Sequence, residues 1–143
     1  MTPSDINTVI RKLEYLRGEM QTLKGYAQWT QSEFLKDEIK RSAAERKLHV
    51  AIESCIDIAR LLISVNDLRP PRTDEDIFVI LESHGIIPAR LRKKLVSARG
   101  LRNLMVHEYA KIDPKKIFKH LTDDLDDLSD FAQCIATYIK AHS

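Results

Sequence analysis

Three side chains in one short stretch, Arg102, His107 and Tyr109, have types that can act on a phosphodiester. A histidine titrates near neutral pH, so it can take a proton from a ribose 2′-hydroxyl or give one to a leaving oxygen. An arginine can hold a phosphate through two hydrogen bonds and stabilise its developing charge. A tyrosine can orient the phosphate or stack on a base. These types suit RNA cleavage and require no metal ion.

Helix geometry limits how these side chains can meet. Asn103 and His107 are four residues apart and share a helix face, and Arg102 aligns with Tyr109 over about two turns. Arg102 and His107 point about 140° apart on a straight helix. The helix must therefore end near His107, or another surface must complete the site, and a second copy of the chain is the simplest candidate. By spacing alone, a surface arginine, an interhelical histidine and a half-buried tyrosine remain an open alternative.

The net charge of +2, from 23 Lys and Arg against 21 Asp and Glu, does not by itself indicate nucleic acid. Its distribution does, because no acidic residue lies between Glu82 and Glu108. The basic residues of this segment are Arg90, Arg92, Lys93, Lys94, Arg99 and Arg102. The last predicted helix is acidic instead, with Asp123, Asp124, Asp126, Asp127 and Asp130. Either the two segments pair within the molecule, or the basic one, through Lys93, Lys94 and Arg99, binds RNA phosphates.

The elements that must position these residues are all helical. Apolar residues recur at steps of three and four, and no segment has the alternation of a strand. Helices are expected at about residues 4–24, 31–69, 73–85, 88–105 and 113–139. No Gly or Pro interrupts 31–69, and a second helix of about 33 residues, or about 50 Å, fits within this segment. The length of 143 residues fits one domain, 1–143. The sequence predicts an all-α, up-down bundle of about five helices.

The second predicted helix carries polar residues among apolar ones. Glu53 and Asp57 are four residues apart on one face, with Arg46 and His49 nearby. In one interpretation they pair with Arg or His of the fourth helix and hold the bundle together. In the other interpretation, Glu53, Asp57 and Arg46 contact Arg102 or His107 and hold these side chains in position. His49 is expected to be structural, and no residues have the spacing of metal ligands.

The cellular compartment is predicted from the absence of a leader peptide and of a membrane-spanning segment. The N-terminus has no basic and apolar leader, and no stretch approaches the length of a membrane span. Two cysteines, Cys55 and Cys134, lie in apolar surroundings and are expected to be reduced. A cytoplasmic protein with no membrane contact is expected.

The chain resembles a known superfamily. Arg102-x4-His107-x-Tyr109 follows a long helix with Ala44-Glu45-Arg46 and the segment Ala51-Ile52-Glu53-Ser54-Cys55-Ile56-Asp57-Ile58-Ala59. This combination resembles the HEPN superfamily, and more closely the HepT toxins of HepT–MntA toxin–antitoxin modules. The resemblance covers nearly the whole chain, and the combination is much more specific than the Arg-x4-His motif alone.

The resemblance implies a HEPN-like homodimer with a composite cleft and a metal-independent endoribonuclease activity that uses no cofactor. Arg102 and His107 match the catalytic pair of the family, and Asn103 matches its frequent polar residue after the arginine. Tyr109 matches the tyrosine that a partner MntA-like nucleotidyltransferase modifies with AMP. The RNA substrate would be a tRNA or an mRNA. Two alternatives remain: a catalytically silent HEPN partner of a nucleotidyltransferase, and a nucleotide-binding helical bundle.

Overall fold

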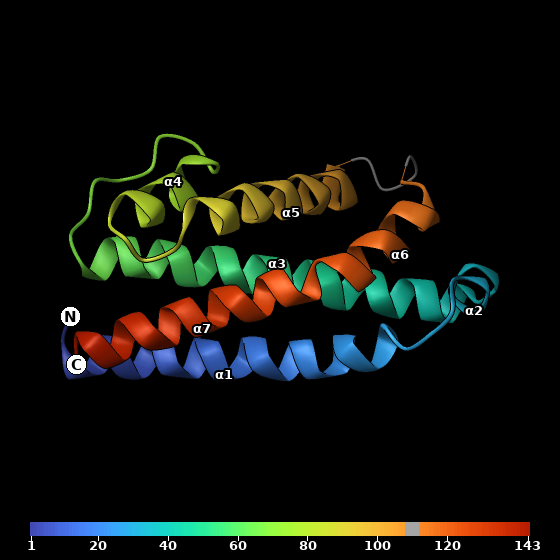
Figure 1. Cartoon of the computed structure of the whole chain (residues 1–143), viewed down its shortest axis with the longest axis horizontal. Helices are drawn as coiled ribbons and strands as arrows, with labels where there is room; N and C mark the ends of the chain where they lie inside the picture. The colour runs from blue at the N-terminus through green and yellow to red at the C-terminus, as the bar shows by residue number, and fades with distance from the viewer. Residues whose placement is uncertain (108–111) are drawn as a thin grey trace.

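Four long helices lie side by side and alternate in direction along the chain (Figure 1). This computed structural model describes residues 1–107 and 112–143. The helices within those residues are α1 (Pro3–Tyr26), α2 (Gln31–Lys36), α3 (Glu38–Val65), α4 (Asp76–Ser83), α5 (Ala89–His107), α6 (Pro114–Asp123) and α7 (Leu125–Ala141). The prediction of an all-α, up-down bundle is confirmed, but the described residues form seven helices rather than about five.

The long helix α3 is the centre of the bundle. It packs against α1 along much of its length, α7 lies across both, and α5 lies on the other side of α3 (Figure 1). The short helices α2 and α6 pack together at one end of the bundle, and α4 joins α3 and α5 at the other. The N- and C-termini lie close together at the end away from α2. Helix α3 therefore contacts every described element that carries a candidate site residue.

The predicted second helix is two helices in the structure. Asp37, at their junction, has φ −117° and ψ 106°, which is extended backbone. Its carboxylate accepts hydrogen bonds from the backbone N–H of Ile39 at 2.9 Å and of Lys40 at 3.3 Å, and so caps α3. The prediction of one helix over 31–69 was wrong, because an aspartate can end one helix and begin the next without Gly or Pro.

The predicted last helix is also divided. Asp124 separates α6 from α7, and its carboxylate lies 2.6 Å from Nδ1 of His120 in the preceding turn. The backbone nonetheless continues almost helically, since the N–H of Asp124 donates to the carbonyl of His120 and Leu128 donates to Asp124. The break is a change of direction, which lets α6 pack on α2 while α7 crosses α1 (Figure 1).

The apolar periodicity correctly identified the buried faces. The buried stripe of α5 is Leu91, Leu95, Ala98, Leu101 and Met105, and it continues across Gly100 as predicted. The buried stripe of α6 and α7 likewise includes Ile117, Leu121, Leu125, Leu128, Ala132, Ile135 and Ile139. Helix α1 begins at Pro3, close to the predicted residue 4, and Thr2 is its N-cap. Thr2 and Asp5 form a reciprocal capping box.

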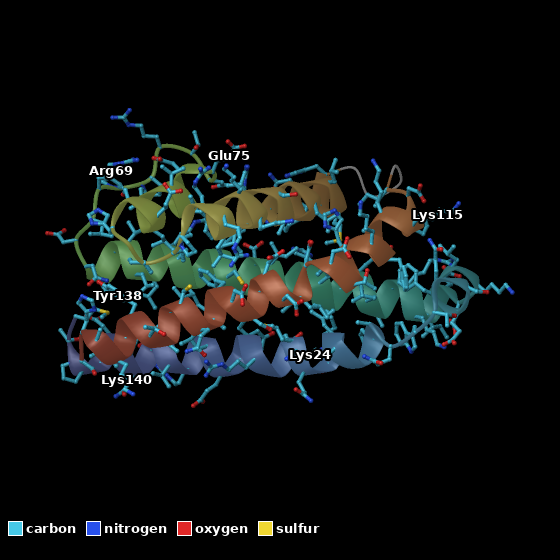
Figure 2. The ribbon with its side chains drawn as sticks, in the orientation of Figure 1. Lys24, Arg69, Glu75, Lys115, Tyr138 and Lys140 are labelled. Carbon is cyan, nitrogen blue, oxygen red and sulfur yellow. The ribbon has the colours of Figure 1, made fainter. Side chains whose placement is uncertain are left out.

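The outside of the bundle carries charged side chains. Figure 2 shows the side chains of Lys24 and Lys140 extending outward from α1 and α7. None of the described helices is both long and apolar enough to cross a membrane. Cys55 is buried and Cys134 is half-buried, and burial raises the pKa of both thiols. Both cysteines are free, as expected for reduced thiols.

Candidate functional site: Arg102 and the polar face of α3

Arg102 lies in the last two turns of α5, directly after the buried Leu101. Because α5 packs on α3 through its apolar stripe, the stem of Arg102 is carried against α3, and its side chain is only 13% exposed. A guanidinium in this position needs compensating groups, since an unpaired charge is costly to bury.

Two neighbours hold the Arg102 guanidinium. Its Nε lies 2.9 Å from Oε2 of Glu53, an ion pair across the α3–α5 interface. The Nε–H makes no hydrogen bond, so this contact is a close charge pair without hydrogen-bond geometry. Nη1 donates to Oδ1 of Asn103 at 2.8 Å. Among the described residues Nη2 has no hydrogen-bond partner, so this nitrogen is available to a ligand.

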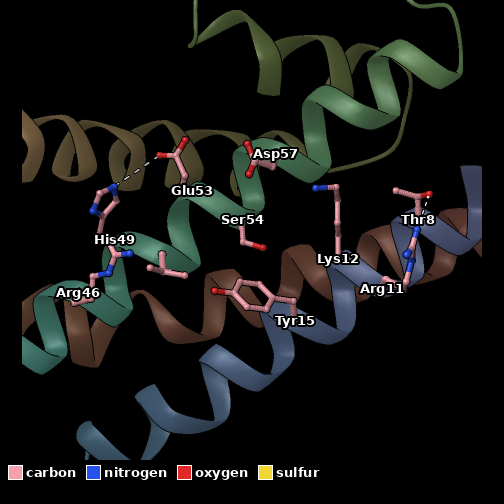
Figure 3. A pocket seen from close by; sticks show the side chains of 10 residues that line it. Thr8, Arg11, Lys12, Tyr15, Arg46, His49, Glu53, Ser54 and Asp57 are labelled. Carbon is pink, nitrogen blue, oxygen red and sulfur yellow. Dashed lines mark hydrogen bonds and ion pairs between the residues drawn. The ribbon is translucent and has the colours of Figure 1, made fainter.

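Glu53 also connects Arg102 to His49, which the sequence predicted to be structural. Its Oε2 lies 3.9 Å from Nε2 of His49, one turn earlier on α3 (Figure 3). Glu53 therefore contacts one group from its own helix and one from α5. Asp57 and Arg46 do not share this contact: both are exposed, and neither forms an ion pair with Arg102 or any other described residue.

His107 is the last residue of α5 and is exposed to solvent. Because α5 runs unbroken to His107, the angular separation of about 140° from Arg102 expected for a straight helix applies. Within the described residues, no hydrogen bond or ion pair joins the two side chains. Asn103 lies with Arg102, as the hydrogen bond requires. Tyr109 lies outside the described residues.

The basic segment is largely neutralised by ion pairs within the molecule. Arg92 pairs with Glu82 at 2.7 Å, and Arg99 lies 3.4 Å from Glu75 and 3.7 Å from Asp74. The Arg99 side chain is only 18% exposed, which leaves it poorly placed for an additional phosphate.

Arg90 reaches the acidic last helix, 3.4 Å from Asp130 and 4.0 Å from Asp127. Burial raises the pKa of the Asp127 carboxyl, whereas the positive charges of Lys94 and Arg90 act to lower it. Lys93 and Lys94 are exposed and make no ion pair among the described residues. Of the three predicted phosphate ligands, the two lysines are exposed and form no ion pair among the described residues, whereas Arg99 is less exposed and is paired with carboxylates.

A pocket of about 560 Å³ between α1 and α3 adds residues that the sequence did not single out (Figure 3). We call it the α1–α3 pocket. Its wall from α3 includes Arg46, His49, Glu53 and Asp57. Its wall from α1 is formed by Thr8, Arg11, Lys12 and Tyr15. The available signal was the polar face of the first helix, where Arg11 and Tyr15 are four residues apart opposite the buried stripe.

Across residues 1–107 and 112–143, His, Cys, Asp and Glu form no group of three or more that could hold a metal ion. The pair of His120 and Asp124, 2.6 Å apart, is too small a set for such a site.

Two proteins of assigned activity are similar in sequence. The chain is 26% identical over 128 residues to the tRNA nuclease HepT of Aphanizomenon flos-aquae, which covers 90% of this chain and 87% of that protein. It is 28% identical over 104 residues to the mRNA nuclease HepT of Shewanella oneidensis, which covers 73% of this chain and 78% of that protein. The two relatives are named for different RNA classes.

A solved structure has the same fold. It is the tri-AMPylated Shewanella oneidensis HEPN toxin in complex with MNT antitoxin, with a TM-score of 0.77, 25% identity, and coverage of 96% of this chain and 99% of that chain. The family model of HepT-like ribonucleases matches residues 16–135, a span that includes α3, α5 and the Arg-x4-His-x-Tyr motif. The chain therefore belongs to the ribonuclease HepT-like family.

Proposed function

We propose that this protein is the toxin of a toxin–antitoxin pair and that it cleaves RNA without a metal ion. Arg102 and His107 are its catalytic residues, with Asn103 orienting Arg102. The proposal rests on family membership and on one observation: Glu53 and Asn103 hold the Arg102 guanidinium, while Nη2 has no hydrogen-bond partner among the described residues. An oriented guanidinium can bind a phosphate without first losing the entropy of a mobile side chain.

The chemistry follows from the two residue types. The 2′-hydroxyl oxygen of a ribose attacks the adjacent phosphorus, and the bond from phosphorus to the 5′-oxygen of the next nucleotide breaks. His107 takes the 2′-hydroxyl proton or supplies a proton to the departing 5′-oxygen, since an imidazole does either near neutral pH. Arg102 stabilises the additional negative charge on the phosphoryl oxygens. The product ends are a 2′,3′-cyclic phosphate and a 5′-hydroxyl.

The positions of the two residues favour a homodimer. Arg102 is directed toward α3, and exposed His107 stands at the helix end about 140° away, so one chain does not bring them together. In a symmetric dimer, Arg102 of one protomer and His107 of its partner can face one cleft. The exposed apolar side chains Leu104 and Val106 beside them are suitable for contact between the protomers.

Neutralisation is proposed to act on Tyr109. A partner nucleotidyltransferase joins the tyrosine oxygen to the α-phosphorus of ATP, and pyrophosphate leaves. The similar Shewanella oneidensis toxin is described as tri-AMPylated in complex with its antitoxin. Tyr109 lies two residues after His107, so each added phosphate would bring negative charge close to the catalytic residues. That charge repels RNA and competes for Arg102.

Cleavage is tested with purified protein and total RNA in the presence of EDTA. The wild type is expected to produce fragments with cyclic phosphate ends, and Arg102→Ala and His107→Ala are each expected to lower the rate at least about 100-fold. Arg92→Ala is the matched control, because Arg92 also lies on α5 and pairs with a carboxylate at 2.7 Å. Intact RNA with the wild type, or equal losses in Arg92→Ala and Arg102→Ala, would contradict the proposal.

Modification is tested by co-expression with an MntA-like nucleotidyltransferase. The intact mass is expected to increase by whole AMP units, and Tyr109→Phe is expected to abolish the increase. A complex that forms while RNA remains uncut by the separated wild type would instead support a silent binding partner. Heat on titration with AMP, with no RNA cleavage, would support a nucleotide-binding bundle.

A further inference from the structure

The α1–α3 pocket gathers three cations, Arg11, Lys12 and Arg46. Among the described residues, Arg11, Lys12 and Arg46 form no ion pair, and Arg11 donates only to Oγ1 of Thr8 at 3.3 Å. The arginines of α5 differ, because each of them pairs with a carboxylate. Cations that converge on one pocket without a carboxylate partner can neutralise an anionic ligand with little internal competition.

An aromatic side chain stands among these cations. Tyr15 is 56% exposed, and Figure 3 shows it between Arg46 on one side and Lys12 on the other. An exposed ring flanked by positive charges is the arrangement that binds single-stranded nucleic acid, because the ring stacks on a base while the cations contact phosphates on either side.

The pocket leads toward the catalytic residues. Arg46 and His49 also line a smaller pocket of about 220 Å³ whose far wall is Met105, in the last turn of α5. Glu53, in the floor of the α1–α3 pocket, is the ion-pair partner of Arg102. The two pockets share Arg46 and His49, so the α1–α3 pocket adjoins the end of α5 that carries Arg102 and His107.

We propose that the α1–α3 pocket binds the single-stranded RNA segment next to the scissile phosphate. Arg11, Lys12 and Arg46 contact backbone phosphates, and Tyr15 stacks on one base. The charge of Glu53 is offset by Arg102, so Asp57 is the opposing carboxylate in the pocket. The proposal rests on the proposed ribonuclease function and adds where the substrate lies.

The test measures binding of a short fluorescein-labelled single-stranded RNA by fluorescence anisotropy over a range of salt concentrations. The full chain with His107→Ala prevents cleavage during the measurement. The double variant Arg11→Ala/Lys12→Ala is expected to raise Kd about tenfold at 0.1 M salt. It should also reduce the slope of log Kd against log salt by about 1.4, or about 0.7 for each lost phosphate contact. Tyr15→Ala is expected to raise Kd about tenfold, and Tyr15→Phe should retain binding.

The matched control is Arg17→Ala/Lys24→Ala, which removes the same charge from exposed positions of α1 outside the pocket. It is expected to leave the salt slope unchanged. RNA binding with equal Kd and slope in both double variants overturns the pocket proposal and leaves the ribonuclease function standing. No RNA binding by the parent protein overturns both. A change in sedimentation mass of the pocket variant would assign the pocket to contact with a second copy, which also overturns the proposal.

Discussion

Arg102 has contacts suited to two different roles. Its ion pair with Glu53 links α5 to α3, and its available Nη2 can bind a phosphate. The two roles are compatible, because Glu53 approaches Nε while Asn103 accepts from Nη1, and neither occupies Nη2. A carboxylate behind a catalytic arginine fixes the direction in which the guanidinium points, and this direction determines the strength of transition-state contacts.

Replacing Glu53 should therefore change the rate of cleavage more than the binding of RNA. Glu53→Gln removes the charge next to Nε but preserves the size of the side chain, so we expect kcat to fall about tenfold while KM changes little. Steady-state cleavage of a labelled RNA gives both constants. Glu82→Gln is the control, since Glu82 of α4 pairs at 2.7 Å with Arg92, which lies on α5 as Arg102 does. Similar kinetics in the two variants would show that Glu53 has only a structural role.

At the scale of elements, the placement of Arg102 depends on how α5 returns along α3. The turn between α4 and α5 contains Gly85, whose φ of +70° lies in the left-handed region. The N–H of Gly85 donates to the carbonyl of Glu82, and the N–H of Ile86 donates to that of Leu81. This turn ends α4 and directs the chain into α5. Gly18 differs because it lies inside α1, where no special conformation is needed.

The two glycines should respond oppositely to alanine. Gly85→Ala should lower the free energy of unfolding by about 1 kcal/mol, because an L-residue disfavours positive φ. Gly18→Ala should raise it by about 1 kcal/mol, because alanine is the better helix former. A Cβ at either position meets no atom within 4 Å, so a steric clash does not contribute to either change in the free energy of unfolding. Urea denaturation measures both, and shifts of the same sign would contradict this account.

At the scale of the whole molecule, the charge that matters is distributed differently from the sequence prediction. Ion pairs with Glu82, Asp74, Glu75 and Asp130 neutralise much of the basic segment in α5. Cations without ion-pair partners among the described residues instead line the α1–α3 pocket. The site also remains divided in one chain, since Arg102 and His107 do not meet. Both features belong to the surface formed by α1, α3 and the end of α5.

Assembly should depend on the apolar side chains near His107. Val106 is 47% exposed, and an aspartate there would have to be desolvated if a second copy covers it. Val106→Asp is therefore expected to raise the dimer dissociation constant at least about tenfold and to lower cleavage at dilute concentration. Val79→Asp, on α4 at 38% exposure, is the control. Sedimentation equilibrium checks the masses, and an unchanged dimer in Val106→Asp would exclude this surface as the interface.

The periodic apolar residues determined the helices and their buried faces, as the stripe of α5 illustrates. This information is local, because each side chain direction follows from 3.6 residues per turn. The breaks at Asp37 and Asp124 were missed, since an aspartate is compatible with either a helix surface or a cap. The motif itself also identified Arg102, Asn103 and His107 as candidates before any fold was known.

Only the tertiary structure decided which charges are neutralised. Glu53 and Asp57 are four residues apart, so the sequence places both carboxylates on one face of the helix. In the structure only Glu53 lies against Arg102. Arg99 was predicted to bind phosphate, but its side chain is directed to Glu75. Arg11 and Lys12 were not predicted to be site residues, yet they line the α1–α3 pocket. The physical reason is that ion pairing depends on distances of a few ångström between different helices. Helix packing sets those distances, and the sequence pattern of one helix does not contain them.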